Sequence, residues 1–210
     1  MSITYAITVC DEIVEIDRLL NILQHCIRPD DQIYVQCDEL KFSNALRKIL
    51  IKHGVVFTLK NFNGNFSEYK NQIYQYCKGD WIFFIDADEY PSMILLESIH
   101  SILDAAVDVD AIVIPRVNTV EGIDNEHIAK WRWVETQLIV GDRSVDVINF
   151  PDYQWRIQRN IESIRWVNKV HEVLTGFTAY ARLPADPDYC LFHPKTIEKQ
   201  ERQNELYSNL

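Results

Sequence analysis

The chain has 210 residues, of which 47% are hydrophobic and 25% charged, and its formal net charge is −10. These values are typical of one folded domain with a buried core, and they exclude a disordered chain. The negative charge argues against a protein that works mainly by neutralising nucleic-acid phosphates, so we expect no nucleic-acid partner, although a local basic pocket for a small phosphate ligand is compatible with it.

No apolar run approaches the roughly 20 residues of a membrane span, and Met1–Val9 lacks the basic start and long apolar stretch of a secretory signal. We therefore expect a cytoplasmic protein without a transmembrane segment. The five cysteines are odd in number and include no Cys-x-x-Cys pair. Buried, reduced thiols are expected in place of a zinc ribbon or a complete disulfide framework.

Short apolar runs alternate with helix-like stretches along the first half of the chain. In chain order we expect a strand Ile3–Val9, a helix over 13–23, a strand Gln32–Cys37, a helix Asn44–Lys52, a strand Val55–Leu59, a helix from Ser67 to Cys77, a strand Trp81–Ile85, a helix Met93–Ala105 and a strand Ala111–Pro115. Ser67 suits the N-cap of the third helix, and Lys78-Gly79-Asp80 suits its C-terminal end.

The alternation of strands and helices predicts a mainly parallel sheet with helices on both faces. Ligands bind such sheets beyond the carboxyl ends of the strands. Three aspartates, Asp11, Asp38 and Asp86, fall at predicted strand ends of this kind. The sequence therefore predicts a polar ligand site at that edge of the sheet.

The second half of the chain differs in character. Four of the five tryptophans lie there, and few helical repeats occur before a helix expected over Thr196–Tyr207. No linker rich in proline, glycine or serine divides the two halves. We expect one domain over residues 1–210, in which 116–210 covers the substrate of a site built by 1–115.

The acidic sequence Asp86-Ala87-Asp88-Glu89 directly follows the apolar strand Trp81–Ile85. The chain has two further Asp-x-Asp pairs, 108–110 and 186–188, which have the features of solvated loops. Three acids after a buried strand repel one another unless a cation or hydrogen bonds compensate them. A hard divalent ion such as Mg²⁺ or Mn²⁺ satisfies this requirement, and capping of a helix N-terminus by the acids is the alternative.

An ordered series of segments resembles the family 2 glycosyltransferases with the GT-A fold. The segments are Asn65–Asn71, Lys78–Trp81, Phe84–Glu89, Trp155–Ile157, Ile164–Trp166 and Val170–Leu174. With the N-terminal strand and helix they span residues 3–195. The resemblance implies a GT-A-like α/β fold, with a Rossmann-like, mainly parallel sheet flanked by helices and a C-terminal acceptor-side extension. It also implies that residues 1–115 bind a nucleotide sugar and that 116–210 face the acceptor.

The resemblance implies a role for each residue that matches the family pattern. Residues expected to bind the nucleotide sugar are Thr8, Cys10, Asp11, Gln36 or Asp38, Lys70 and Asp86. Asp88 is expected to bind the metal that bridges the donor diphosphate, with His193 completing the metal shell, and Glu172 to act as general base. Two segments depart from the pattern: Cys10-Asp11-Glu12 stands where Asn-Glu is usual, and Gln36-Cys37-Asp38-Glu39 replaces an Asp-Ser/Gly stretch. The departures leave the donor base open, with a UDP-sugar favoured.

The chemistry implied is an inverting, hexosyltransferase-like displacement on an unidentified acceptor hydroxyl. A metal held by Asp88 would neutralise the charge that develops on the leaving diphosphate. A carboxylate such as Glu172 would accept the proton of the attacking hydroxyl. The expected cofactor is Mn²⁺ or Mg²⁺.

Several alternatives stay open at the level of the sequence. The chain as a whole is also compatible with a non-catalytic nucleotide- or sugar-binding relic of the same fold. A phosphatase of the haloacid dehalogenase type fits less well, because Tyr90 stands where that class has Thr or Val. Glu172 could be a surface acid and His193 a structural histidine. The remaining residues with two readings are Trp155 and Trp166 (sugar stacking or core) and Arg156, Arg159 and Arg165 (phosphate binding or solvent).

Overall fold

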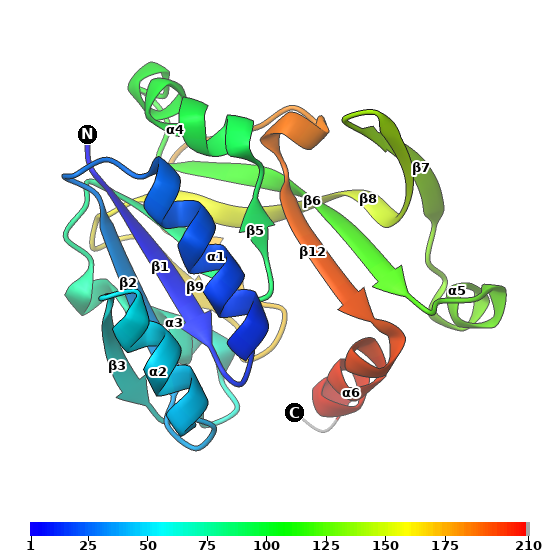
Figure 1. The fold of residues 1–210 in the computed structure, drawn as a ribbon. Helices are drawn as coiled ribbons and strands as arrows, with labels where there is room; N and C mark the ends of the chain where they lie inside the picture. The colour runs from blue at the N-terminus through cyan, green and yellow to red at the C-terminus, as the bar shows by residue number, and fades with distance from the viewer. Residues whose placement is uncertain (209–210) are drawn as a thin grey trace.

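The structure of the protein is a computed structural model that describes residues 1–208, with α6 spanning Ile197–Ser208. One ten-stranded sheet takes strands from both halves of the chain, in the order β3-β2-β1-β4-β8-β6-β12-β5, with β11 beside β6 and β7 beside β8 (Figure 1). The first four of these strands are parallel: β1 (Ile3–Val9), β2 (Gln32–Asp38), β3 (Val56–Lys60) and β4 (Trp81–Asp86).

The order of the parallel strands reverses at β1. The chain runs outward from β1 to β2 and β3, and then returns to place β4 on the other side of β1. In this register Thr8 of β1 lies opposite both Gln36 of β2 and Asp86 of β4. A crevice opens at such a switch point beyond the carboxyl ends of the strands. The acidic sequence therefore begins at the position where an open α/β sheet binds its ligand.

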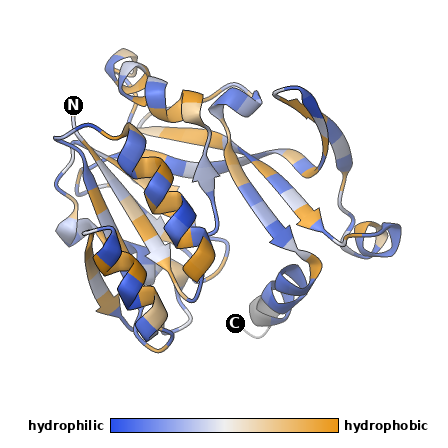
Figure 2. Ribbon diagram, viewed as in Figure 1, coloured by the Kyte–Doolittle hydropathy of each residue, from blue (hydrophilic) through white to orange (hydrophobic). Residues whose placement is uncertain are grey.

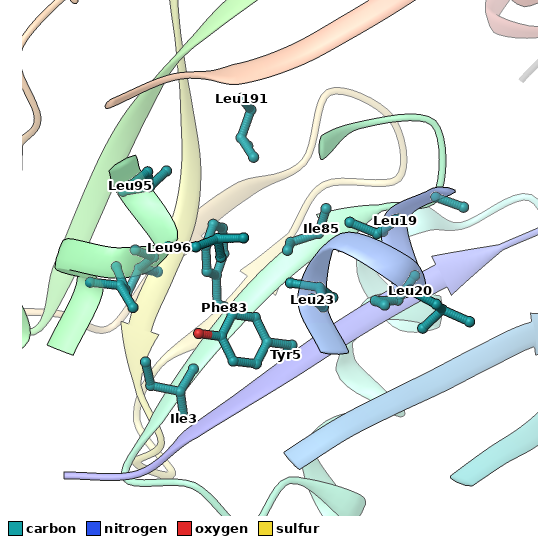
Figure 3. Close-up of a cluster of buried hydrophobic side chains, with 14 of the residues drawn as sticks. Ile3, Tyr5, Leu19, Leu20, Leu23, Phe83, Ile85, Leu95, Leu96 and Leu191 are labelled. Carbon is teal, nitrogen blue, oxygen red and sulfur yellow. The ribbon is translucent and has the colours of Figure 1, made fainter. Parts of the chain in front are cut away.

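Side chains alternate between the two faces of the parallel strands and build two separate cores. On one face Tyr5, Phe83 and Ile85 pack with leucines of α1 (Ile13–Cys26) and α4 (Met93–Ala105), as Figure 3 shows. On the other face Ala6 and Phe84 pack with Tyr74 and Trp166. This second core lies beneath α3 (Phe66–Asn71) and the 3₁₀ turn Tyr74–Tyr76, and α3 contacts β9 (Arg165–Val167).

The second half of the chain extends the sheet with antiparallel and mixed pairing. The long strand β8 (Arg143–Arg159) pairs with β4, with β6 (Ala111–Glu121) and with β7 (Glu135–Val140). The remaining elements are α2 (Asn44–Lys52), β5 (Tyr90–Pro91), α5 (Asn125–Trp131), β10 (Val173–Thr175), β11 (Tyr180–Arg182), the 3₁₀ turn Pro187–Tyr189 and β12 (Leu191–Thr196). Figure 2 shows that α6 is mostly polar, whereas α1 and α2 carry both apolar and polar residues.

Most predicted elements of the first half are confirmed, and the third helix is the main error. Its N-cap is Asn65, whose side chain accepts a hydrogen bond from the Glu68 amide at 3.2 Å, and the helix ends at Asn71. Gly79 does not adopt a left-handed conformation. A glycine is required at position 79 because a Cβ there would lie 2.5 Å from the backbone nitrogen of Thr4 in β1. The turn that leads into β4 is thus set by close packing against β1.

The strand predicted over Ala111–Pro115 is also too short, because β6 continues to Glu121. Pro115 lies between the residues that pair with β11 and those that pair with β12, where a residue without an amide proton is tolerated. The five cysteines are free thiols. None of the helices within residues 1–208 is long and apolar enough to cross a membrane.

Candidate functional site

The candidate site is formed where β4 ends beside β1. Asp86 is the last residue of β4, and its Oδ1 accepts a hydrogen bond from Thr8 Oγ1 at 3.1 Å. The chain then turns tightly: the Ala87 amide bonds the Thr8 carbonyl, and the Glu89 amide bonds the Asp86 carbonyl. Three carboxylates consequently project from four successive residues at the strand switch point.

Two arginines from the second half, the buried Arg156 and the partly buried Arg116, compensate Asp86 and Glu89. Arg156 of β8 places Nη2 2.7 Å from Asp86 Oδ2 and 2.6 Å from Glu89 Oε1. Arg116 of β6 places Nη1 2.9 Å from Glu89 Oε1. Burial alone would raise the pKa of Asp86, but Arg156 and Lys70 outweigh it and hold that pKa well below its usual range. The charge repulsion from which the sequence suggested a metal is therefore relieved by the chain itself.

A second network orients His193 toward Asp88. Asp152 accepts hydrogen bonds from Arg116 and from the Asn118 amide nitrogen at 2.9 Å, so the Asn118 oxygen must face His193. His193 Nδ1 lies 2.9 Å from that oxygen and therefore carries the proton. The other ring nitrogen, Nε2, lies 3.2 Å from Asp88 Oδ2.

This tautomer leaves an unusual contact. Burial lowers the pKa of His193 below its ordinary value even though Asp88 acts to raise it. In the neutral ring the lone pair of Nε2 then points at a carboxylate oxygen, which is unfavourable unless a cation lies at the two atoms. Within residues 1–208 no three His, Cys, Asp or Glu side chains are grouped to hold a metal. Asp88 and His193 alone offer a two-ligand site that a substrate phosphate could complete.

A lysine from the C-terminal helix already reaches Asp88. Lys199 of α6 places Nζ 3.3 Å from Asp88 Oδ2 and 3.5 Å from Glu15 Oε1 of α1. Burial disfavours its charged form, but the carboxylates of Asp88, Glu12 and Glu15 outweigh this and raise the pKa of Lys199. The amine is therefore a cation beside Asp88 at neutral pH.

Glu172 and Lys70 form a further ion pair next to Asp86. Lys70 is buried, and its Nζ lies 2.6 Å from Glu172 Oε1 and 3.6 Å from Asp86 Oδ1. The same amine lies 4.8 Å from the centre of the Trp166 ring. Three residues expected at the site from the sequence are thus brought into one chain of contacts, although they lie far apart in the chain.

The ends of β1 and β2 carry the other predicted ligand residues. Cys10 Sγ lies 3.9 Å from Asp38 Oδ2, and burial together with Glu12, Asp11 and Asp38 raises the pKa of this thiol to about 12. Asp11 is exposed. Gln36 is fully buried, with its amide nitrogen 2.6 Å from the Tyr69 carbonyl. Of the pair Gln36 and Asp38, Asp38 is therefore the one nearer the open end of the strands.

The arginines and tryptophans for which the sequence allowed two roles make contacts within the protein. Arg156 binds the acids, Arg159 donates to the carbonyls of Ala106, Val107 and Val109, and Arg165 donates to those of Ile161 and Ile164. Trp166 is a core residue packed edge-on against Phe84. Trp155 packs against Phe177 and Tyr180. None of these three arginines simply faces solvent.

Four residues of the site were missed or misread in the sequence: Arg116, Asn118, Arg156 and Lys199. A signal exists for two of them, because Arg116 and Arg156 interrupt apolar stretches that read as strands. Beside His193, Tyr90 and residues of the second half form a largely apolar hollow of about 240 Å³, lined by Tyr90, Val117, Thr119, Val140, Val145, Phe192, His193 and Pro194.

Comparison with known proteins identifies the fold. No protein-family model matches the sequence, and no curated protein matches it. The structure is similar to that of S. aureus TarS 1-349 in complex with UDP-GlcNAc, with a TM-score of 0.61 and 14% identity over 93% of this chain and 59% of that one. For TarS 1-349 in complex with UDP the TM-score is 0.60 and the identity 14%, over 98% of this chain and 64% of that one. The chain thus spans less than two thirds of these structures, and the GT-A fold expected from the sequence is confirmed.

Proposed function

We propose that this chain, which has the GT-A fold, is a family 2-type glycosyltransferase that moves a hexose-like sugar from a nucleoside diphosphate donor to an acceptor hydroxyl. The observation that carries the proposal is the position of Asp86 and Asp88 at the strand switch point, with Glu172 and His193 of the second half beside them. A UDP-sugar is the favoured donor, because the TarS structures of the same fold contain UDP-GlcNAc and UDP.

The donor would lie across the ends of β1, β2 and β4. In this proposal Thr8, Cys10, Asp11 and Asp38 bind the nucleoside, and Asp86 contacts the ribose. Gln36 supports the pocket from beneath through its bond to the Tyr69 carbonyl. Lys70 supplies positive charge toward the nucleotide. Residues 116–210 would face the acceptor, and the hollow beside His193 lies on that side.

Asp88 and His193 would hold the divalent ion, Mn²⁺ or Mg²⁺. The bare Nε2 of a neutral imidazole facing a carboxylate oxygen at 3.2 Å suits a metal, and Asn118 holds the ring in the required tautomer. When bound, the ion would supply positive charge to the leaving diphosphate.

Glu172 is proposed as the general base. The carboxylate is partly exposed, and Lys70 holds one of its oxygens in place at 2.6 Å. The acceptor hydroxyl would transfer its proton to Glu172 as its oxygen bonds the anomeric carbon and the bond from that carbon to the diphosphate breaks. A single displacement of this kind inverts the configuration at the anomeric carbon.

The donor site is tested by calorimetric titration with UDP, GDP and CDP, with and without Mn²⁺. We expect one of the three, UDP, to bind in a metal-dependent manner, and we expect Asp88→Ala to abolish that dependence. Asp108→Ala is the matched control, since it removes an exposed acid from another Asp-x-Asp pair. If no nucleotide binds under either condition, the proposal fails.

The general base is tested with Glu172→Gln. The substitution keeps the shape of the side chain but removes the proton acceptor, so turnover should fall by about 10²–10⁴-fold. The affinity for UDP should stay within about twofold, because Glu172 is assigned to the acceptor and the oxygen of the glutamine can still accept the hydrogen bond from Lys70 Nζ. Sugar transfer is measured by release of UDP. Unchanged turnover would remove Glu172 from the mechanism.

A further inference from the structure

The cation beside Asp88 differs from those beside the other two acids. Asp86 and Glu89 are held by Arg156, whose side chain is 3% exposed and fixed between them. Asp88 is held by Lys199, whose side chain is 28% exposed and comes from the last helix of the structure, α6. A lysine is a point charge on a flexible four-carbon stem, so it can change partner without rearrangement of the fold.

Lys199 also stands at the opening of the proposed donor site. Its second partner, Glu15, lies in the first turn of α1, the helix that follows β1 and the residues proposed to bind the nucleoside. Lys195 lies on β12 between His193 and α6, and its amine bonds the side chain of Gln200 at 3.4 Å. The two lysines thus bring positive charge to the side of Asp88 where a diphosphate would be bound.

Building on the proposed function, we propose that Lys199 exchanges partners during donor binding. In the free chain it neutralises Asp88, and when a nucleoside diphosphate enters it binds a phosphate oxygen and releases Asp88 to the metal ion. A diphosphate is a stronger partner for an ammonium group than one carboxylate, because it carries more charge and more acceptor oxygens.

A consequence of this exchange is cooperativity between the donor and the metal. An ammonium 3.3 Å from Asp88 Oδ2 opposes a divalent ion at the same carboxylate, since like charges at this distance repel strongly in a partly buried site. The free chain should therefore bind Mn²⁺ weakly. The donor would withdraw the ammonium and so raise the affinity for Mn²⁺, and by linkage Mn²⁺ would raise the affinity for the donor by the same factor.

The purely structural alternative is that Lys199 only fastens α6 to α1. The two roles are separated by Lys199→Met, with Arg202→Met as the matched control, because Arg202 is an exposed cation on the same helix. We would measure the affinity for UDP and for uridine by calorimetry in the presence of Mn²⁺. The affinity for Mn²⁺ without nucleotide would be measured by electron paramagnetic resonance.

For Lys199→Met we expect the affinity for UDP to fall by about tenfold, the equivalent of one charge-assisted hydrogen bond, while uridine binding stays unchanged. The affinity of the nucleotide-free chain for Mn²⁺ should rise severalfold. Arg202→Met should alter none of the three. Lys199→Arg retains the charge and should keep the UDP affinity near the original value; it also serves if the methionine variant does not fold.

Three results would overturn the inference: equal weakening of UDP and uridine, weaker binding of Mn²⁺ by the nucleotide-free variant, or no effect on any ligand. The first two would assign Lys199 the fastening role. If the unaltered chain binds UDP but the variants match it, the donor site stands and only the role of Lys199 falls. If the unaltered chain binds no nucleotide at all, the proposed function falls with it.

Discussion

Asn118 determines which nitrogen of His193 faces Asp88. Its amide nitrogen is committed to Asp152, and its oxygen therefore accepts from His193 Nδ1. Groups that hold a ligating histidine in this way raise metal affinity by fixing both the tautomer and the ring plane. Asn118 has a positioning role in the proposed metal site, although it does not itself touch the ion.

Asn118→Ala should lower the affinity for Mn²⁺ in the presence of UDP by about 10–100-fold, the range typical of groups that orient a metal ligand. Gln154→Ala is the control, because Gln154 also bonds Asp152, at 2.7 Å, without contacting His193. The measurement is a Mn²⁺ titration followed by electron paramagnetic resonance. Equal effects of the two variants would show that Asp152, and not the tautomer of His193, is what matters.

Glu89 contributes mainly to stability. Its side chain is fully buried and bonded to Arg116 and Arg156, so Glu89→Gln leaves the buried guanidinium of Arg156 and the partly buried one of Arg116 short of a negative partner. We expect the free energy of unfolding, measured by urea denaturation, to fall by about 3 kcal/mol. Glu97→Gln on the exposed side of α4 should change it by less than about 0.5 kcal/mol. A loss for Glu89→Gln as small as that would contradict the role of the ion pairs.

At the scale of elements, the turn before β4 depends on close packing. Gly79 lies against β1, where an added Cβ would meet backbone atoms of Thr4 and Ile3 at 2.5 and 2.6 Å. Backbone atoms in a sheet do not move aside as the end of a flexible side chain does. The position at which β4 enters the sheet consequently depends on the absence of a side chain at Gly79. The position of Asp86, at the other end of β4, depends on it as well.

Gly79→Ala should therefore destabilise the chain by more than about 2 kcal/mol, as other overpacked positions do. Gly54→Ala serves for comparison, because a Cβ there meets no atom within 4 Å and only the φ of +64° is unfavourable. The free energy of unfolding of Gly54→Ala should fall by about 1 kcal/mol. Both are measured by urea denaturation, and an equal loss for the two would show that close packing at Gly79 is unimportant.

The elements that could be predicted from the sequence are those whose pattern is local. β1, α2, β4 and α4 combine apolar runs or helical spacing with clear ends, and the acids after β4 mark the site. Arg156 could not be placed, because its position depends on β8 lying between β4 and β6 with a register shift near Val113. The contact of Lys199 with Asp88 could not be predicted for a similar reason, because the sequence of a polar helix does not indicate which distant acid it contacts.

For the molecule as a whole, the charge pattern predicts sensitivity to acid. Burial acts to raise the pKa values of Asp86 and Asp152, yet both lie below the usual range because basic neighbours, Arg156 and Lys70 for Asp86 and Arg116 for Asp152, favour the ionised forms. A depressed pKa in the folded state contributes stability that is present above the unfolded-state pKa. That stability is lost as the pH falls toward the folded-state value.

The free energy of unfolding should therefore change little between pH 7 and 5 as far as these carboxyls are concerned, and fall steadily once the pH drops below about 4. Urea denaturation at a series of pH values measures this. Asp152→Asn should make the loss of stability at low pH less steep. The substitution removes a carboxylate that is ionised in the contacts to Arg116 and Asn118 and would take up a proton in acid. A stability that is the same at pH 3 and pH 7 would contradict the assignment of these ion pairs.

The order in which site residues occur along the chain bears on how the protein is made. Asp86, Asp88 and Glu89 leave the ribosome after Lys70, which pairs with Asp86, but before the two arginines of β6 and β8, and Lys199 emerges later still. A nascent chain that has reached only α4 carries three carboxylates at the end of an apolar strand with neither arginine to offset them. The ion pairs of the site are thus complete only after β6 and β8 have joined the sheet, so we expect an interrupted chain to be less stable and more readily degraded by cellular proteases.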